Sequence, residues 1–210
     1  MARTKSRFVC QECGYVASSW LGRCPECGGW NTLVEEAEVT AKASKSYLPA
    51  NNEKLRPRTI ASVAQTKVER LATGIREFDR VLGGGVVPGS LVLLGGTPGI
   101  GKSTILLDAG MRFGQQGIKV LYVSGEESEE QTAMRAVRLG GAQANDNLLI
   151  LTATDLDAIL AQANALKPQL LIIDSIQTMY NPELQTAAGS VGQVRECTAK
   201  LLQFAKSTGI

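Results

Sequence analysis

From about residue 59 onward, short apolar runs alternate with stretches in which apolar residues recur at helical spacing. The runs predict four strands, at Leu91–Leu94, Val120–Ser124, Leu148–Leu151 and Leu170–Asp174. The helical spacing predicts helices at about 102–116, 128–139, 155–166 and 190–207. Because strands that alternate with helices form parallel sheets with right-handed crossovers, the pattern predicts an α/β fold. The runs are almost continuously apolar, as expected when helices cover both faces of a sheet.

The chain before residue 59 has a different pattern of apolar and polar residues. Residues 35–58 lose the apolar periodicity and contain Glu, Lys, Ser and Asn together with Pro49 and Pro57, which predicts a flexible linker. Residues 1–34 are too few to fold on a hydrophobic core alone, and four of the five cysteines lie there. The sequence therefore predicts a small ribbon at 1–34, a linker at 35–58 and an α/β core at 59–210.

Composition narrows the chemistry that these parts can perform. The chain has no histidine, which excludes Ser-His-Asp and Cys-His catalysis and every zinc site with a histidine ligand. Acid–base work near neutral pH must then fall to carboxylates, lysine or cysteine. Lys and Arg number 22 against 20 Asp and Glu, so the net charge of +2 is too small to indicate nucleic-acid binding by itself.

Apolar runs also bear on where the protein works. The longest of them are far shorter than the ~20 residues that a helix needs to span a bilayer. The basic N-terminus is not followed by the apolar segment of a secretory signal, so we expect a cytoplasmic protein without membrane contact. In that compartment cysteines usually serve metal or redox chemistry. Cys197 stands alone in a predicted helix, where we expect it to be buried as a small hydrophobic residue.

The other four cysteines form two pairs with the spacing C-x₂-C-x₁₀-C-x₂-C, namely Cys10, Cys13, Cys24 and Cys27. A glycine follows the second cysteine of each pair and allows the positive φ that a tight metal-binding turn needs. Four thiolates form a closed tetrahedral site, which predicts structural Zn²⁺ whose binding folds the ribbon. Two disulfides, a redox pair or a rubredoxin-type iron site are the alternatives. We expect Tyr15, Trp20 and Trp30 to pack around the site.

A glycine-rich loop follows the first predicted strand. It matches G-x-x-x-x-G-K-[ST] and consists of Gly96, Thr97, Pro98, Gly99, Ile100, Gly101, Lys102 and Ser103, with Thr104 next. An apolar strand before the loop and an amphipathic helix after it are the context that a phosphate-binding loop requires. Gly99 and Gly101 let backbone N–H groups approach phosphate oxygens, and the start of the helix favours negative charge there. Lys102 is expected at the β- and γ-phosphates, and Ser103 is expected as a ligand of Mg²⁺.

Carboxylates at the ends of two other strands complete this prediction. Asp174 ends an apolar strand, as does the aspartate that holds the magnesium shell in phosphate-loop enzymes; the alternative is an ordinary strand-end cap. Glu126 and Glu127 follow another strand at the same edge, where ligands bind to parallel sheets. Glu126 is the predicted general base and Glu127 the second candidate. Both could instead belong to the acidic first turn of a helix.

Several motifs occur together in this chain. They are the four-cysteine ribbon, Thr73-Gly74, Glu77-Phe-Asp-Arg-Val-Leu-Gly-Gly-Gly85, Pro88-Gly89, the loop ending in Gly-Ile-Gly-Lys-Ser-Thr104, and Ser124-Gly-Glu-Glu-Ser128. Together they resemble the bacterial RadA (Sms) proteins from Arg7 to the end of the chain. The resemblance implies a RecA-like core, a hexameric ring, ATP as substrate, and DNA-stimulated ATP hydrolysis that drives branch migration of recombination intermediates. It also implies single-stranded and branched DNA as partners.

The resemblance also raises expectations for the C-terminal part. In RecA-like proteins the loop after the aspartate strand faces DNA, which makes Gln193 and Arg195 candidate contacts; a plain surface loop is the alternative. The Lys-Asn-Arg-Phe-Gly motif and the protease-like domain of RadA proteins do not occur here, so we expect the core to be truncated and to hydrolyse ATP weakly.

Two other functions compete with a DNA-stimulated motor. One is a nucleotide-gated scaffold whose ribbon docks a repair helicase or a recombinase. The other is a RecA-like phosphotransferase, because paired glutamates such as Glu126 and Glu127 also occur in autokinases.

Overall fold

The computed structural model describes residues 6–37, 59–64, 69–140, 146–184 and 186–210. Within the first of these ranges three short strands form the ribbon. They are β1 (Ser6–Cys10), β2 (Val16–Ala17) and β3 (Leu33–Ala37), which pair antiparallel in the order β2-β1-β3. Strand β3 crosses the predicted boundary between ribbon and linker at residue 34, and the rest of the linker lies outside the described residues.

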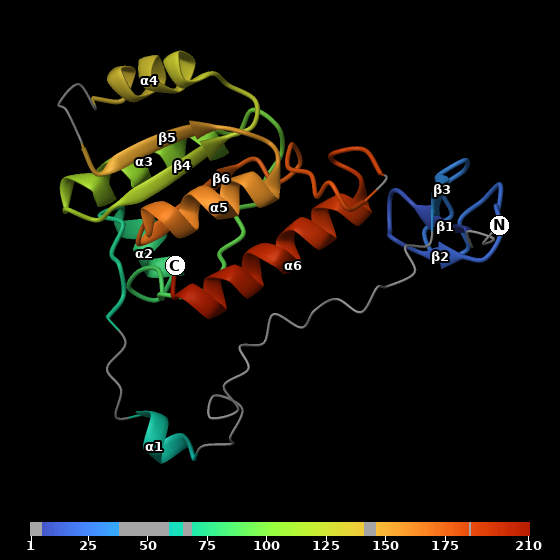
Figure 1. The fold of residues 1–210 in the computed structure, drawn as a ribbon, viewed down its shortest axis with the longest axis horizontal. Coiled ribbons are helices and arrows are strands. Elements are labelled where there is room, and N and C mark those ends of the chain that lie inside the picture. Colours follow the sequence, from blue (N-terminus) through green and yellow to red (C-terminus); the bar gives the residue numbers. More distant parts are fainter. Residues whose placement is uncertain (1–5, 38–58, 65–68, 141–145, 185) are drawn as a thin grey trace.

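The core consists of one sheet between two layers of helices (Figure 1). Its strands β4 (Val120–Ser124), β5 (Leu148–Thr152) and β6 (Leu170–Asp174) are parallel and follow the order β5-β4-β6. Helices α3 (Lys102–Gln115), α4 (Glu129–Arg138), α5 (Leu156–Leu166) and α6 (Val191–Thr208) lie close to the predicted ranges. The predicted α/β fold with a parallel sheet is therefore confirmed.

Alternation along the strands decides which side chains face which layer. On β4, Leu121 and Val123 pack with α5 and α6 on one face, while Val120 and Tyr122 pack with α3 on the other. All four side chains are buried because helices cover both faces. Cys197 on α6 is also buried, as expected. Asp174, which ends β6, lies on the face of the sheet that α3 covers, because it follows by two residues Ile172, which packs with α3.

Capping residues explain where the helices begin. Ser128 accepts a hydrogen bond from the Gln131 amide and the Gln131 side chain bonds back to Ser128, which closes a capping box at α4. Asp155 caps α5 and Ser190 caps α6 through side-chain oxygens that accept from backbone amides of the first turn. Two further helices, α1 (Ile60–Ala64) and α2 (Arg76–Val81), precede the glycine-rich loop and were not predicted.

One predicted strand is wrong. Residues Leu91–Leu94 form no strand, and Leu93 is 77% exposed. The segment instead forms one wall of a cavity of about 360 Å³, whose other walls come from β6, α3 and α6. A strand needs a hydrogen-bonded neighbour as well as an apolar run, and no described residue provides one here.

No helix in the described part of the chain is long and apolar enough to cross a membrane.

Candidate functional site

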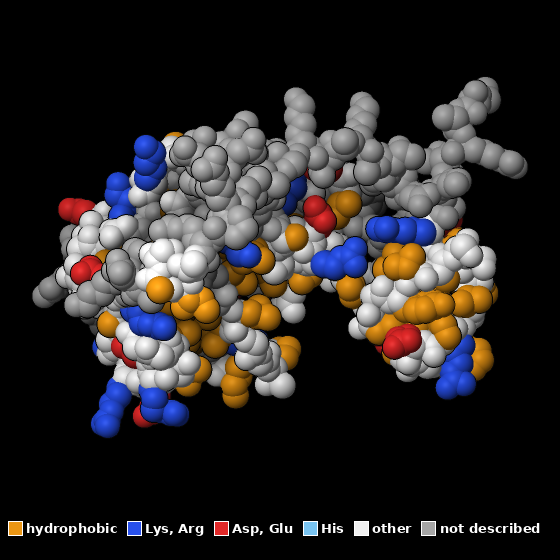
Figure 2. Space-filling model, turned by 90° about the horizontal axis from the view of Figure 1, so that it is seen from below, with side chains coloured by type: hydrophobic (Ala, Val, Ile, Leu, Met, Phe, Trp, Pro, Cys, Tyr) orange, Lys and Arg blue, Asp and Glu red, His pale blue; other side chains and the backbone are white. Residues whose placement is uncertain are grey.

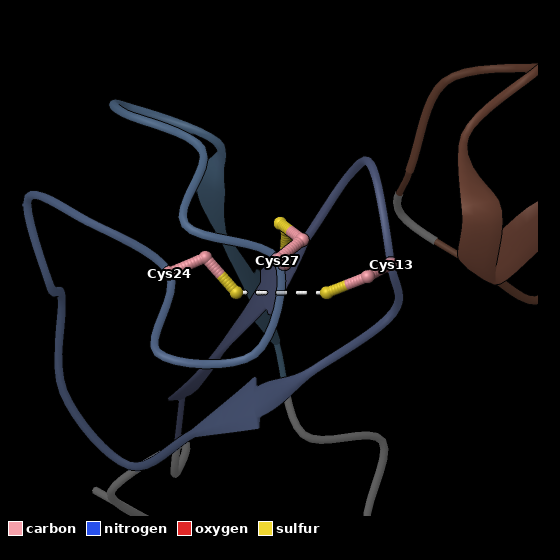
Figure 3. Close-up of side chains that lie close together, drawn as sticks. Cys13, Cys24 and Cys27 are labelled. Carbon is pink, nitrogen blue, oxygen red and sulfur yellow. Dashed lines mark hydrogen bonds between the residues drawn. The ribbon is translucent and has the colours of Figure 1, made fainter.

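The four ribbon cysteines converge on one point. Their sulfur atoms all lie within 4.8 Å of one another, and Cys13 and Cys24, 3.5 Å apart, face each other in Figure 3. Each pair is held by a turn in which a glycine amide donates to the carbonyl oxygen of the first cysteine at 2.9 Å, from Gly14 to Cys10 and from Gly28 to Cys24. Both glycines have positive φ, 77° and 75°. The sequence pattern therefore predicted these turns correctly.

The sulfur cluster fits a tetrahedral metal ion rather than disulfides. Every cysteine in the described ranges is free, and no sulfur pair is close enough for a bond of about 2.05 Å. A hydrogen bond with the Thr32 hydroxyl lowers the pKa of Cys10 to about 6, whereas desolvation and the crowding of four sulfurs raise the pKa of Cys13 and that of Cys27, the latter to about 12. A cation bound among the sulfurs would favour the thiolate form that a metal requires. Four sulfur ligands with no open position suit structural Zn²⁺.

The aromatic residues of the ribbon do not all pack around this centre. Tyr15 packs against the cluster of Cys10, Cys24 and Leu33, as expected. Trp20 and Trp30 are 56% and 71% exposed, so the prediction that they cover the centre is wrong. Figure 2 shows hydrophobic side chains at the surface of the ribbon.

One reason for the exposure of Trp30 is its partner. The Arg23 guanidinium lies 5.7 Å from the centre of its ring and also donates to the Gly28 carbonyl. The tryptophan therefore stacks on an arginine at the surface instead of filling the small interior.

The glycine-rich loop leads directly into α3. Gly101 precedes the helix with φ of 101°, and Gly99 has φ of 77°, a region that glycine adopts without strain. Lys102 folds back over the loop and donates to the carbonyl oxygens of Gly96 and Thr97, both at 2.9 Å. The ammonium group thus lies inside the loop, at the start of a helix whose first N–H groups favour an anion.

Asp174 joins this loop to the sheet. Its Oδ1 accepts from the Ser103 hydroxyl at 2.9 Å, and its Oδ2 accepts from the Tyr122 hydroxyl at 2.5 Å. Burial, together with the hydrogen bond to Asp174, raises the pKa of Tyr122 well above its ordinary value, so the phenol remains a donor. Carboxylate and hydroxyl oxygens side by side are the ligands that Mg²⁺ prefers, so Ser103 and Asp174 fit the ion predicted for them.

The two glutamates that follow β4 have different surroundings. Glu126 is exposed, and its Oε1 accepts a hydrogen bond from Ser175 at 3.1 Å. Glu127 is held in an ion pair with Arg135 of α4, whose side chain is only 20% exposed. The Glu127 carboxylate is therefore engaged in fastening α4 to the sheet, whereas the Glu126 carboxylate faces the open edge beside Asp174.

The loop after β6 is anchored by a buried amide. Gln193 is 1% exposed; its Oε1 accepts from the Asn181 amide at 2.8 Å, and its Nε2 donates to the carbonyl oxygens of Asn181 and Thr186. Gln193 is thus occupied by the loop itself, which does not agree with a side chain that contacts DNA. Arg195 is exposed on α6, where its predicted contact with DNA stays a prediction.

Sequence reasoning missed three residues of these sites, which are Tyr122, Arg135 and Asn181. Arg135 pairs with Glu127, eight residues earlier, and the Asn181 backbone bonds to the Gln193 side chain, twelve residues later. Neither contact follows from a local motif in the sequence. The alternation along β4 does place Tyr122 on the same face as Ser124, but only the register with β6 shows what it reaches.

Comparisons with known proteins match both parts of the chain to known families. Residues 56–210 match the family described as AAA domain, and residues 8–35 match the family described as rubredoxin metal binding domain. A DNA repair protein RadA from Halalkalibacterium halodurans is 49% identical over 211 residues, which is 100% of this chain and 46% of that protein. The DNA repair protein RadA of Bacillus subtilis is 47% identical over 212 residues, again with 100% of this chain and 46% of that protein covered.

The chain thus spans about half the length of the curated relatives that it matches. Its resemblance to the N-terminal part of RadA proteins is confirmed by these relatives, and the four-cysteine ribbon supports Zn²⁺ as its metal. With its larger part, residues 56–210, the chain belongs to the AAA domain family.

Proposed function

We propose that this chain binds ATP with Mg²⁺ and hydrolyses it, and that hydrolysis serves DNA repair. The observation that carries the proposal is the convergence of Lys102, Ser103, Asp174 and Glu126. These four residues come from the start of α3 and from the carboxyl ends of two neighbouring strands. A phosphate chain at the glycine-rich loop would have a cation, a metal-binding pair and an exposed carboxylate beside it.

Each residue then has a defined task. Lys102 exchanges its two carbonyl acceptors in the loop for phosphate oxygens, and the loop amides donate to the same phosphates. Ser103 and Asp174 would hold Mg²⁺, which would neutralise charge on the phosphates. Glu126 accepts a proton from water as the water oxygen attacks the γ-phosphorus, and the bond from that phosphorus to the bridging oxygen breaks to leave ADP and phosphate.

The relatives support the biological role. RadA relatives are DNA repair proteins by name, and a role in DNA repair for this chain follows from that similarity. We infer that single-stranded or branched DNA stimulates hydrolysis and that a ring of subunits, expected to be a hexamer in the cytoplasm, promotes branch migration. The loop that Gln193 anchors, with the exposed Arg195 after it, is the proposed DNA-facing surface.

Turnover of ATP, measured with and without single-stranded DNA, tests this proposal. It is measured for this chain and for a full-length relative such as the Bacillus subtilis protein. Lys102→Ala should abolish nucleotide binding and turnover in this chain. Hydrolysis that persists in that variant would show that the phosphate assignment is wrong, and a full-length protein indifferent to DNA would exclude the motor.

The ribbon supports a second candidate function, a scaffold that docks a helicase or a recombinase. The exposure of Trp20 and Trp30 favours it, because large aromatic side chains at a surface are typical of contact sites. Trp30→Ala should then weaken partner binding in a pull-down with purified repair proteins while ATP turnover is unchanged. Unchanged binding in that variant would argue against this function.

A further inference from the structure

Tyr122 lies where the register of the sheet brings it close to Asp174. In the pairing of β4 with β6, Tyr122 is opposite Ile172 and Ser124 is opposite Asp174. Asp174 is therefore the diagonal neighbour of Tyr122 on the same face of the sheet, at a separation that an aromatic side chain can bridge. The phenol hydroxyl donates to Asp174 Oδ2 at 2.5 Å.

Packing fixes the tyrosine ring. Tyr122 is 1% exposed and belongs to the cluster that α3 forms with β4 and β6, together with Leu107, Phe113 and Ile172. A ring enclosed in this way keeps one rotamer, so its hydroxyl has a fixed position at the edge of the cluster. The packing of β4 against α3 therefore holds the Tyr122 hydroxyl in place whether or not a ligand is bound.

The two oxygens of Asp174 have separate partners. Oδ2 is held by Tyr122, and Oδ1 faces the Ser103 hydroxyl at 2.9 Å. A donor on one oxygen fixes the rotation of the carboxylate group about its last bond, which is otherwise broad. Hydrogen bonds of this kind orient metal ligands and tune their affinity for the metal.

We propose that Tyr122 is a positioning residue for the metal ligand Asp174: its hydroxyl holds the carboxylate so that Oδ1 points toward Ser103. This inference rests on the proposed function, because it needs Mg²⁺ and nucleotide at the loop. Phenylalanine at position 122 would fill the same space but leave Oδ2 without its donor. The hydroxyl therefore contributes to metal binding separately from the packing of the ring.

The test compares nucleotide affinity with and without the metal. Fluorescent ADP is titrated with this chain in excess Mg²⁺ and again in EDTA, and the ratio of the two dissociation constants gives the gain from Mg²⁺. Tyr122→Phe should reduce that gain by about tenfold, as removal of a residue behind a metal ligand does. The affinity in EDTA should stay within about twofold, because the bonds from loop and lysine to phosphate are untouched.

Thr132→Val is the matched control. Thr132 is also fully buried, on α4, and its hydroxyl has no hydrogen-bond partner among the described residues. This variant should leave the Mg²⁺ gain unchanged. In an Asp174→Asn background Tyr122→Phe should have no further effect on the gain, because the hydroxyl acts through that carboxylate.

The results separate the possible failures. An unchanged Mg²⁺ gain in Tyr122→Phe, or an equal loss with Mg²⁺ and with EDTA, overturns the positioning role while nucleotide binding stands. A wild-type chain that gains nothing from Mg²⁺ overturns the proposed function and this inference with it.

If Tyr122→Phe does not fold, a second measurement on unsubstituted protein tests the same inference. In wild-type protein with 3-fluorotyrosine at position 122, the fluorine resonance should shift more on addition of ADP with Mg²⁺ than of ADP with EDTA. Equal shifts would contradict the inference.

Discussion

Gly125 connects the strand β4 to Glu126 in a space that excludes any side chain. A Cβ added there would lie 1.9 Å from Thr178 Oγ1, 2.8 Å from Thr178 Cβ and 2.9 Å from Met179 Cε. Thr178 cannot easily move, since its hydroxyl donates to the Ser175 carbonyl at 2.8 Å, and Met179 is fully buried. Gly125→Ala must therefore push apart the segments that carry Glu126 and Asp174.

The cost has two parts. Overpacking of a tight contact destabilises by about 1–3 kcal/mol. Loss of the hydrogen bond from Thr178 to Ser175 adds about 1 kcal/mol. We therefore expect Gly125→Ala to lower the free energy of unfolding by about 2–4 kcal/mol and the melting temperature by roughly 5–15 °C. ATP turnover should fall as well, because the Gly125 amide donates to the Asp174 carbonyl at 2.9 Å and displacement of this contact moves both carboxylates.

Urea unfolding followed by circular dichroism measures the stability term. Gly95→Ala is the control, because nothing lies within 4 Å of a Cβ at that position, and its effect should stay within about 0.5 kcal/mol. Thr178→Ala should partly rescue Gly125→Ala, since it removes the closest atom. If Gly125→Ala were as stable as Gly95→Ala, the close approach of the two segments would be refuted.

Three further outcomes are expected. Glu126→Gln should lower ATP turnover about 10²–10⁴-fold, whereas Glu127→Gln should mainly lower stability by breaking its ion pair; steady-state kinetics and thermal melting separate the two, and equal kinetic losses would contradict the assignment. Cys24→Ser should abolish Zn²⁺ binding, measured by atomic emission, and should unfold the ribbon but not the core. Both tryptophans of the chain lie in the ribbon, so their fluorescence reports its unfolding, and metal retained by the variant would disprove the four-sulfur centre. Gln193→Leu should cost about 2–3 kcal/mol in urea unfolding because buried backbone groups lose their partners, while Arg195→Ala should cost less than about 0.5 kcal/mol, and a reversed order would refute the anchoring role.

Local features of the chain were predictable because neighbours in sequence decide them. The turns around Cys10 and Cys24 follow from a spacing of three with a glycine next, and the loop before Lys102 follows from its glycines. Helices α4 and α6 begin within one residue of the predicted starts, since Ser128 and Ser190 cap them through their own side chains. The parallel α/β arrangement also follows from the order of strands and helices alone.

Other features depend on which strands are neighbours and in what register, and these were decided only by the tertiary structure. The sequence predicted Glu126 as the general base and kept Glu127 as the second candidate, and only the fold shows that Arg135 pairs with Glu127. Gln193 seemed a surface residue until the loop folded over it, and Leu91–Leu94 lacked the neighbour that would make it a strand. The packing of the sheet, its helices and the loop after β6 determines these contacts, so they do not follow from local sequence patterns.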